Sequence, residues 1–253
     1  MFQIQTLGGF RVRIGDREIP PTAWTREKAL HLFQLLVTLR RTRPHKEQIV
    51  DLLWPELDPE TGGRDFRVAL NAIQNALEPD REPRTPSGII VRSELNYSLN
   101  PETVQIDADI FEEHLSAAHQ ASKTGLEGVI EHYAAALALY HGDYLPERRY
   151  EDWTASERER LHTLALSAMT RLAEILLPAD PIETLRLTRR ALELDPLWEN
   201  AYRIEIQAHL AAGNRPMAIR TYQSCKKVLM DEFGLEPLPE TRRLVQGLSA
   251  TDL

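Results

Sequence analysis

The sequence predicts an α+β N-terminal domain followed by an all-α domain of helical repeats. Residues 2–20 alternate apolar and polar, which is typical of short strands. Between residues 25 and 99, three stretches with helical spacing precede a β-rich hairpin. From residue 104 onward the apolar residues follow helical spacing almost throughout. These patterns divide the chain into domains at 1–103 and 104–253.

Composition and charge fit a globular protein with two cores. At 253 residues with 42% apolar and 27% charged residues, the chain can bury two cores, and no apolar run approaches the ~20 residues that span a bilayer. The N-terminus lacks the pattern of a secretory signal, so we expect a cytoplasmic protein without a membrane partner. The single Cys225 excludes an internal disulfide, fits a reducing compartment and is expected to be buried as a small apolar residue.

The charge is unevenly distributed along the chain. Residues 1–105 carry 14 basic and 14 acidic side chains, whereas residues 106–253 carry 16 and 24, which accounts for the net charge of −8. A net acidic protein can bind DNA when its cations gather on one surface. The neutral N-terminal half is therefore the better candidate for such a surface.

Turn and cap residues punctuate the N-terminal half. Gly8-Gly9 and Gly15-Asp16 separate the strands expected in residues 2–20. Three helices are expected next, and they begin at Thr25 as N-cap, at His45, and near Gly63 after a loop over 55–63. The third helix ends before Pro79, and the strands 89–92 and 96–99 then form the hairpin.

The third helix is the candidate reader of DNA bases. Its apolar residues share one face, namely Phe66, Ala69, Leu70, Ile73 and Leu77. Its polar residues share the other, namely Arg64, Arg67, Asn71, Gln74 and Asn75. Arginine pairs in two-pronged fashion with guanine, and asparagine or glutamine with adenine. An ordinary amphipathic surface helix is the alternative, and the surrounding helix–helix–helix–hairpin order favours insertion into the major groove.

Other basic and polar residues are expected to contact phosphates, which position a protein on DNA without reading its sequence. The candidates are Thr25, Arg26 and Lys28 in the first helix, Lys46 at the start of the second, and Arg92 in the hairpin. The N-terminus of the second helix is a further candidate. The run Arg40, Arg41 and Arg43 fits either phosphate contact or neutralisation of a helix C-terminus.

The second half contains a repeat of 34 residues. Helices are expected near 108–121, 124–141, 154–177, 181–194, 197–212, 214–232 and 238–248. Thr184, Thr188 and Ala191 lie 34 positions before Ala218, Tyr222 and Cys225, which is the tetratricopeptide period. Val129, Tyr133 and Ala136 have the same internal spacing in an earlier helix. The pattern predicts helical hairpins that each bury a face against the next.

The sequence shows no catalytic or metal-binding constellation. The histidines, His114, His119 and His132 among them, lack metal-ligand spacing, and the Gly8-Gly9 and Gly62-Gly63 pairs lack the Lys-Ser/Thr of a phosphate-binding loop. We therefore expect no enzyme activity, no metal and no cofactor.

Several longer motifs resemble those of a known family. In the first half they are L-G-G-F-R-V, K-A-L-H-L-F-Q-L-L, E-Q-I-V-D-L-L-W-P-E, F-R-V-A-L-N-A-I and N-Y-S-L. In the second half they are I-D-A-D, Y-H-G-D-Y-L-P, Y-E-D-W, A-L-E-L-D-P and E-F-G-L-E-P followed by P-E-T-R-R-L. Together they resemble an OmpR-like winged helix-turn-helix and, more closely, the streptomycete antibiotic regulatory protein family. In that family a bacterial transcriptional activator domain of tetratricopeptide-like helices follows the winged helix.

The resemblance implies a cytoplasmic, sequence-specific transcriptional regulator. Members of the family activate transcription by binding tandem promoter repeats, as homodimers or paired monomers, and by recruiting RNA polymerase. The third helix would then read double-stranded DNA and the hairpin would be the wing. The family usually has Leu-Arg where this chain has Ile73-Gln74, and a basic residue where it has Ala72 or Asn75, so the reading helix of this chain carries less positive charge.

The competing hypothesis is a tetratricopeptide-type scaffold for protein interactions whose winged domain no longer binds DNA. The weak basicity of residues 64–77 is its main support.

Overall fold

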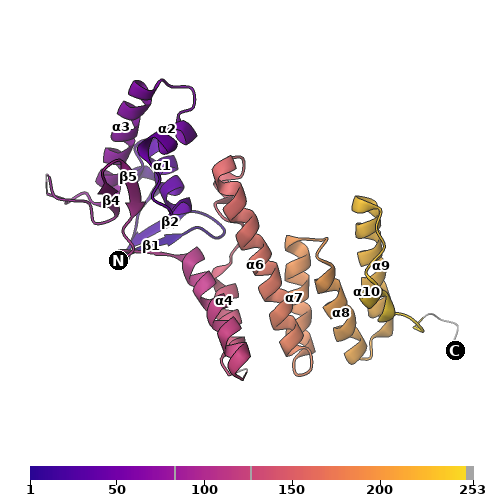
Figure 1. The fold of residues 1–253 in the computed structure, drawn as a ribbon. Helices are drawn as coiled ribbons and strands as arrows, with labels where there is room; N and C mark the ends of the chain where they lie inside the picture. The colour runs from indigo at the N-terminus through magenta and orange to yellow at the C-terminus, as the bar shows by residue number, and fades with distance from the viewer. Residues whose placement is uncertain (83, 126, 249–253) are drawn as a thin grey trace. The chain divides into compact units, whose positions relative to one another are not determined.

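The computed structural model describes residues 1–82, 84–125 and 127–248, and the chain packs into two compact units (Figure 1). The first unit contains residues 1–110 and 139–161, and the second contains the described residues of 111–138 and 162–253. This division differs from the predicted one at 103/104, because residues 139–161 return to pack with the N-terminal elements. The division at 103/104 by function therefore stays a proposal.

The first unit begins with a four-stranded sheet. Its strands are β1 (Phe2–Gln5), β2 (Arg11–Ile14), β3 (Arg17–Glu18) and β6 (Val104–Ile106), in the order β3-β2-β1-β6. The strands expected in residues 2–20 are confirmed and pair antiparallel, and β6 adds to β1 in parallel. Sequence inspection missed β6, because three residues are too few to show an alternating pattern before the helix that follows.

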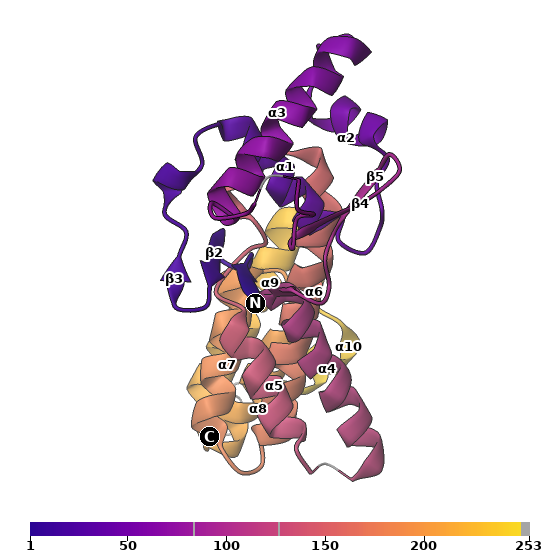
Figure 2. The same cartoon turned by 90° about the vertical axis from the view of Figure 1, so that its left-hand side faces the viewer.

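Three helices and a hairpin follow the sheet in the predicted order. They are α1 (Glu27–Thr38), α2 (Lys46–Leu53), α3 (Pro59–Leu77), β4 (Ile90–Ser93) and β5 (Asn96–Leu99), with a short 3₁₀ helix, η1 (Pro21–Ala23), before them. Figure 2 shows α3 in front of α1, with the β4–β5 hairpin alongside. This is the arrangement of a winged helix-turn-helix.

Two predicted helix starts were wrong. The N-cap of α1 is Arg26, which makes no side-chain cap, rather than Thr25. The helix α3 begins at Pro59, within the predicted loop 55–63, because Asp58 caps it by accepting hydrogen bonds from the next two free N–H groups. Gly62 lies inside α3. A Cβ at this position would come within 2.5 Å of Val50 Cγ1, so the missing side chain lets α2 pack closely against α3.

Aromatic and aliphatic side chains fill the core of the first unit. Phe33 is fully buried, with Phe10 edge-on at 5.9 Å and Trp24 stacked at 5.6 Å between ring centroids. Tyr97 of the hairpin packs edge-on against Phe66 of α3 at 4.8 Å and is 4% exposed. Tyr97 therefore has a structural role, and it ties the hairpin to α3.

Residues 141–145 close over the loop after β1. The amide N–H of Gly8 donates to the Asp143 carbonyl at 2.9 Å, and that of Leu145 donates to the Thr6 carbonyl at 2.9 Å. Gly8 has a φ of +83°, and a Cβ there would lie 2.8 Å from the backbone carbon of His141. The two motifs around Gly8 and Asp143 are therefore the two sides of one close backbone contact.

Asp107 joins the same loop to the start of the helical half. Its carboxylate accepts hydrogen bonds from the Thr6 amide, the Thr6 hydroxyl, the Leu7 amide and the Ala108 amide, at 2.6 to 2.9 Å. Burial raises the pKa of Asp107, and these hydrogen bonds act in the opposite direction. Asp107 therefore fixes the end of β1 to the first residue of α4 (Asp107–Thr124).

The helical part has the predicted succession of helices. After α4 come α5 (Val129–Leu139), α6 (Asp152–Leu176), α7 (Pro181–Leu194), α8 (Glu199–Ala211), α9 (Arg215–Phe233) and α10 (Pro239–Arg243), with the 3₁₀ helix η2 (Pro146–Arg148) before α6. The last helix is shorter than the predicted 238–248. Among the described residues, no helix is long and apolar enough to cross a membrane.

The repeat positions form the core between these helices. Thr184, Thr188 and Ala191 of α7 are fully buried, as are Ala218 and Cys225 of α9. Each of these two helices packs against α8. Desolvation raises the pKa of the Cys225 thiol to about 12, which agrees with its predicted role as a small buried residue. The 34-residue period thus marks the residues on which one hairpin stacks against the next.

Candidate nucleic-acid interface

A polar stripe runs along α3. Arg64, Arg67, Asn71 and Asn75 are all exposed, and their spacing of three and four residues places them on one side of the helix. The opposite side is buried through Phe66, Ala69, Ile73 and Leu77, whereas Leu70 is only half-buried. Arg64 lies 3.5 Å from Asp65, but its side chain is 69% exposed, so this ion pair does not hold it.

Gln74 has a different environment from the rest of the stripe. It is half-buried, and its side-chain oxygen accepts a hydrogen bond from Arg81 Nη2 at 3.0 Å. Arg81 also donates to the carbonyl of Thr85 in the loop after α3. Gln74 therefore connects α3 to that loop, a contact that no local sequence pattern indicates.

Lys46 lies beside the N-terminal half of α3. A Cβ on Gly63 would come within 2.7 Å of Lys46 Nζ, so the ammonium group occupies the space that glycine leaves, one turn before Arg67. The N-terminus of α2 is largely satisfied by the protein: Lys46 N–H donates to the Leu95 carbonyl at 2.8 Å, and Glu47 N–H donates to His45 Nδ1 at 3.3 Å. The side chain of Lys46, rather than the helix end, is thus available to a phosphate.

Lys28 has a structural contact instead. Its ammonium group donates to the carbonyl of Leu53, the last residue of α2, at 2.7 Å, and lies 5.8 Å from the centre of the Trp54 ring. A lysine at this place satisfies a helix C-terminus. This pairing was hidden in the sequence, because 25 residues separate Lys28 from Leu53.

Thr25 and Arg26 are exposed before α1. Thr25 shares a cavity of about 390 Å³ with Asn75. The cavity is also lined by Arg17 of β3, Ala72 of α3 and Pro79 of the loop after α3. The structure thus brings one predicted phosphate contact beside one predicted base contact.

The wing carries Arg92 in a fixed position. Arg92 Nε donates to the Glu94 carbonyl at 2.8 Å, and its guanidinium lies 5.9 Å from the centre of the Tyr97 ring. Glu94 at the tip has a φ of +56°, a left-handed conformation that is strained for a residue with a side chain. The wing therefore presents Arg92 held against the backbone of its tip, where Glu94 stands.

Arg40 contacts the end of α1, where its Nη1 donates to the Val37 carbonyl at 3.4 Å, and it also makes ion pairs that the sequence did not indicate. Its side chain is 5% exposed and makes ion pairs with Asp109 Oδ1 at 2.7 Å and Glu157 Oε1 at 2.8 Å. Burial alone would lower the pKa of Arg40, but the two carboxylates raise it. Arg41 lies on the surface, 3.3 Å from Asp109. Arg40 therefore joins the end of α1 to α4 and α6, through acidic residues 69 and 117 positions away.

A second polar contact fixes the same face of α1. The buried Gln34 donates from its side-chain amide to Glu147 Oε1 at 2.8 Å and accepts from Arg148 Nε at 2.7 Å. His31, one turn earlier, has its pKa lowered by burial. The winged-helix elements and residues 139–161 are thus joined by specific polar pairs as well as by apolar packing.

The histidines of the helical part do not build a metal centre. His114 and His132 approach to 3.4 Å between their Nδ1 atoms, which sequence spacing did not reveal. Within the described ranges, no group of three or more candidate ligands gathers.

Comparison with known proteins extends this description. The family described as bacterial transcriptional activator domain matches residues 106–248, which is more than half of the chain. A solved structure of Mycobacterium tuberculosis EmbR, in complex with a low affinity phosphopeptide, shares the fold with a TM-score of 0.81 over 98% of this chain at 20% sequence identity. This chain spans 64% of that protein's chain. No curated protein matches the sequence.

The matched family is that of a transcriptional activator domain. With a winged helix-turn-helix ahead of its matched helical domain, the chain belongs to the bacterial transcriptional activator domain family and is a regulator of the streptomycete antibiotic regulatory protein kind.

Proposed function

We propose that the chain binds specific sequences of double-stranded DNA, with α3 in the major groove and the β4–β5 wing at the neighbouring minor groove. The observation that carries this proposal is the exposed stripe of Arg64, Arg67, Asn71 and Asn75 on a helix whose other side is buried. Lys46 lies beside the stripe and supplies a positive charge for a phosphate. Arg92 would supply the wing contact.

We further propose that two copies act on tandem promoter repeats and recruit RNA polymerase, as the resemblance implies. The length of the stripe supports pairing. From residue 64 to residue 75 an α-helix rises about 16 Å, roughly half of the ~34 Å of one turn of B-DNA. One stripe therefore reads only a few base pairs, and two adjacent sites are needed for specific binding in a genome.

The base-reading assignment is tested by selecting bound sequences from random duplexes and measuring affinity by fluorescence anisotropy. The double change Arg67→Ala and Asn71→Ala should weaken binding at least tenfold, because each bidentate pair contributes ~1–3 kcal/mol. Arg189→Ala, at an exposed position of α7, is the matched control and should leave affinity unchanged. Circular dichroism verifies the fold of each variant. Failure of the unmodified protein to bind any duplex at low salt would instead support the protein-interaction scaffold.

The phosphate contacts are tested by the salt dependence of affinity. Lys46→Ala should reduce the slope of log affinity against log salt by about one. Lys28→Ala should leave that slope unchanged, because its ammonium group is bound to the Leu53 carbonyl. If Lys28→Ala changes the slope and Lys46→Ala does not, the assignment of the two lysines is wrong.

A further inference from the structure

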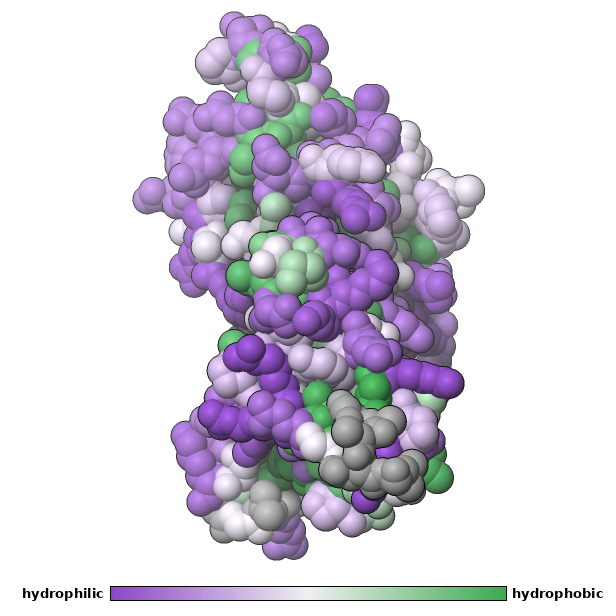
Figure 3. All heavy atoms as spheres, turned by 90° about the vertical axis from the view of Figure 1, so that its right-hand side faces the viewer, coloured by the Kyte–Doolittle hydropathy of each residue, from purple (hydrophilic) through white to green (hydrophobic). Residues whose placement is uncertain are grey.

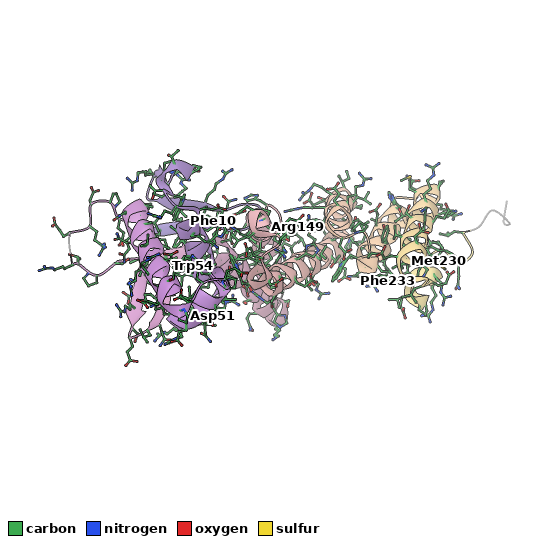
Figure 4. The ribbon with its side chains drawn as sticks, turned by 90° about the horizontal axis from the view of Figure 1, so that it is seen from above. Phe10, Asp51, Trp54, Arg149, Met230 and Phe233 are labelled. Atoms are coloured by element: carbon green, nitrogen blue, oxygen red, sulfur yellow. The ribbon has the colours of Figure 1, made fainter. Side chains whose placement is uncertain are left out.

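The outward face of the first sheet lines a polar cavity of about 280 Å³. Ile4, Val12 and Ile106 are buried on the inward face, so the residues next to them along the strands point outward. Phe10, just before β2, packs edge-on against the buried Phe33, and Figure 4 shows it among the N-terminal elements. All residues that line the cavity belong to the first unit. Six of them are polar side chains of the strands, namely Gln3, Gln5, Arg11, Arg13, Glu18 and Gln105.

Arg11 and Arg13 form a pair of cations in this cavity. They are two residues apart on β2 and thus about 7 Å apart on the same face. Both are exposed, and neither has a hydrogen-bond or ion-pair partner within the described ranges of the chain. Two guanidinium groups at this spacing can hold one phosphate group between them, because each donates hydrogen bonds as a planar fork. The pair is therefore suited to clamp an anion.

Glutamine side chains flank the two arginines on the neighbouring strands. Gln3 lies opposite Arg13 and Gln5 lies opposite Arg11, both on β1. Gln105 of β6 lies opposite Gln3, which continues the row to the edge of the sheet. Since neighbouring strands are about 4.8 Å apart, a single small molecule can reach an arginine and two glutamines at once. An amide side chain both donates and accepts hydrogen bonds, so these positions suit the hydroxyl groups of a ligand.

The charged groups of the cavity balance one another. Glu18 lies opposite Arg13 on β3, and Asp107 lies at the other edge of the sheet, after β6. The two carboxylates and the two arginines leave no formal net charge. A polyanion such as duplex DNA gains little from such a site, whereas a small ligand with one anionic group and several hydroxyl groups matches it. The volume of about 280 Å³ also lies close to the lower limit of ligand pockets, about 300 Å³.

We propose that this outward sheet face binds a sugar phosphate, that is, a phosphate ester of a small molecule rich in hydroxyl groups. Arg11 and Arg13 would hold the phosphate, and the glutamines and Glu18 would pair with the hydroxyl groups. His141 lines the same cavity and begins the segment that closes over the loop after β1. A bound ligand would therefore contact the sheet and this segment together and stabilise the first unit against unfolding. The proposal does not depend on the proposed DNA binding.

The site is tested by isothermal titration calorimetry at constant ionic strength with ribose 5-phosphate, glucose 6-phosphate and fructose 6-phosphate. At least one ester should bind at one site with a dissociation constant below about 1 mM, whereas ribose, glucose and fructose should not bind. The double change Arg11→Gln and Arg13→Gln should weaken binding at least about tenfold, because it removes both charged donors. Arg13→Lys keeps the charge but loses the planar fork, so it should weaken binding by less than the double change.

The matched control is the double change Arg215→Gln and Arg220→Gln, at two exposed positions of α9. Figure 3 shows the side of α9 and α10, where hydrophilic and hydrophobic atoms are mixed. The control should bind the ester like the unmodified chain, and circular dichroism verifies that every variant is folded. The proposal is wrong if no ester binds below about 1 mM, if the free sugars bind as tightly, or if the control loses as much affinity as the β2 double variant. Loss of duplex affinity in the β2 double variant, without any ester binding, would instead assign the two arginines to DNA.

Discussion

Replacing Asp107 by alanine tests the contact that joins the β1 loop to the helical half. The substitution removes the acceptor for three amide N–H groups and one hydroxyl. Thr6 and Leu7 are fully buried, so water cannot replace the carboxylate there. Each buried N–H left without an acceptor costs about 1–3 kcal/mol. Because the Thr6 hydroxyl can rotate to another acceptor, we expect Asp107→Ala to lower the free energy of unfolding by about 3–5 kcal/mol.

Asp107→Asn supplies a graded comparison. Its remaining oxygen can keep the three hydrogen bonds made by Oδ1, from the Thr6 amide, the Thr6 hydroxyl and the Ala108 amide. Only the bond from the Leu7 amide to Oδ2 is lost. We therefore expect the asparagine variant to lose about 1–2 kcal/mol.

The assay is urea unfolding at pH 7, followed by tryptophan fluorescence and circular dichroism. Three of the four tryptophans, at positions 24, 54 and 153, belong to the first unit and so report on its unfolding. Amide hydrogen exchange at Thr6 and Leu7 should accelerate in the alanine variant. A loss below 1 kcal/mol for alanine, or equal losses for alanine and asparagine, would refute this account of Asp107.

Three further predictions concern single positions. Gly8→Ala should destabilise the first unit by about 2–4 kcal/mol, measured by denaturation, because the left-handed backbone at Gly8 and its contact with the backbone of His141 both exclude a Cβ. Gly9→Ala is the comparison for the backbone effect alone, because a Cβ at Gly9 meets open space. Burial alone would raise the pKa of Glu157, but its hydrogen bonds and ion pairs with two arginines lower it, so this carboxylate contributes stability above pH about 4.5 that is lost as the pH falls through its folded pKa. Thermal melts from pH 6 to pH 3 should therefore fall less steeply for Glu157→Gln than for the unmodified chain, and parallel curves would contradict the assignment. Glu94→Gln removes an anion from the wing tip and should raise DNA affinity about two- to fivefold at low salt, with unchanged affinity in anisotropy counting against a wing at the duplex.

The sequence by itself determined the elements and their order. Alternating residues defined the first strands, helical spacing defined α1 to α3, and the 34-residue step placed Ala191 and Cys225 at buried positions of α7 and α9. These features are predictable because strand and helix periods are local, and one apolar face must be buried in each element. The exposed stripe of α3 followed from the same reasoning, since the residues opposite a buried face are left to solvent.

Only the tertiary structure decided which distant groups meet. It added β6 to the first sheet, brought residues 139–161 back to the N-terminal elements, and paired Arg40 with acidic residues far along the chain. It also placed Lys28 on the end of α2 and Lys46 beside α3, two lysines that are indistinguishable by residue type. The physical reason is that an ion pair or a hydrogen bond is set by position in space, whereas the periodicity of a sequence reports only which face of a segment avoids water.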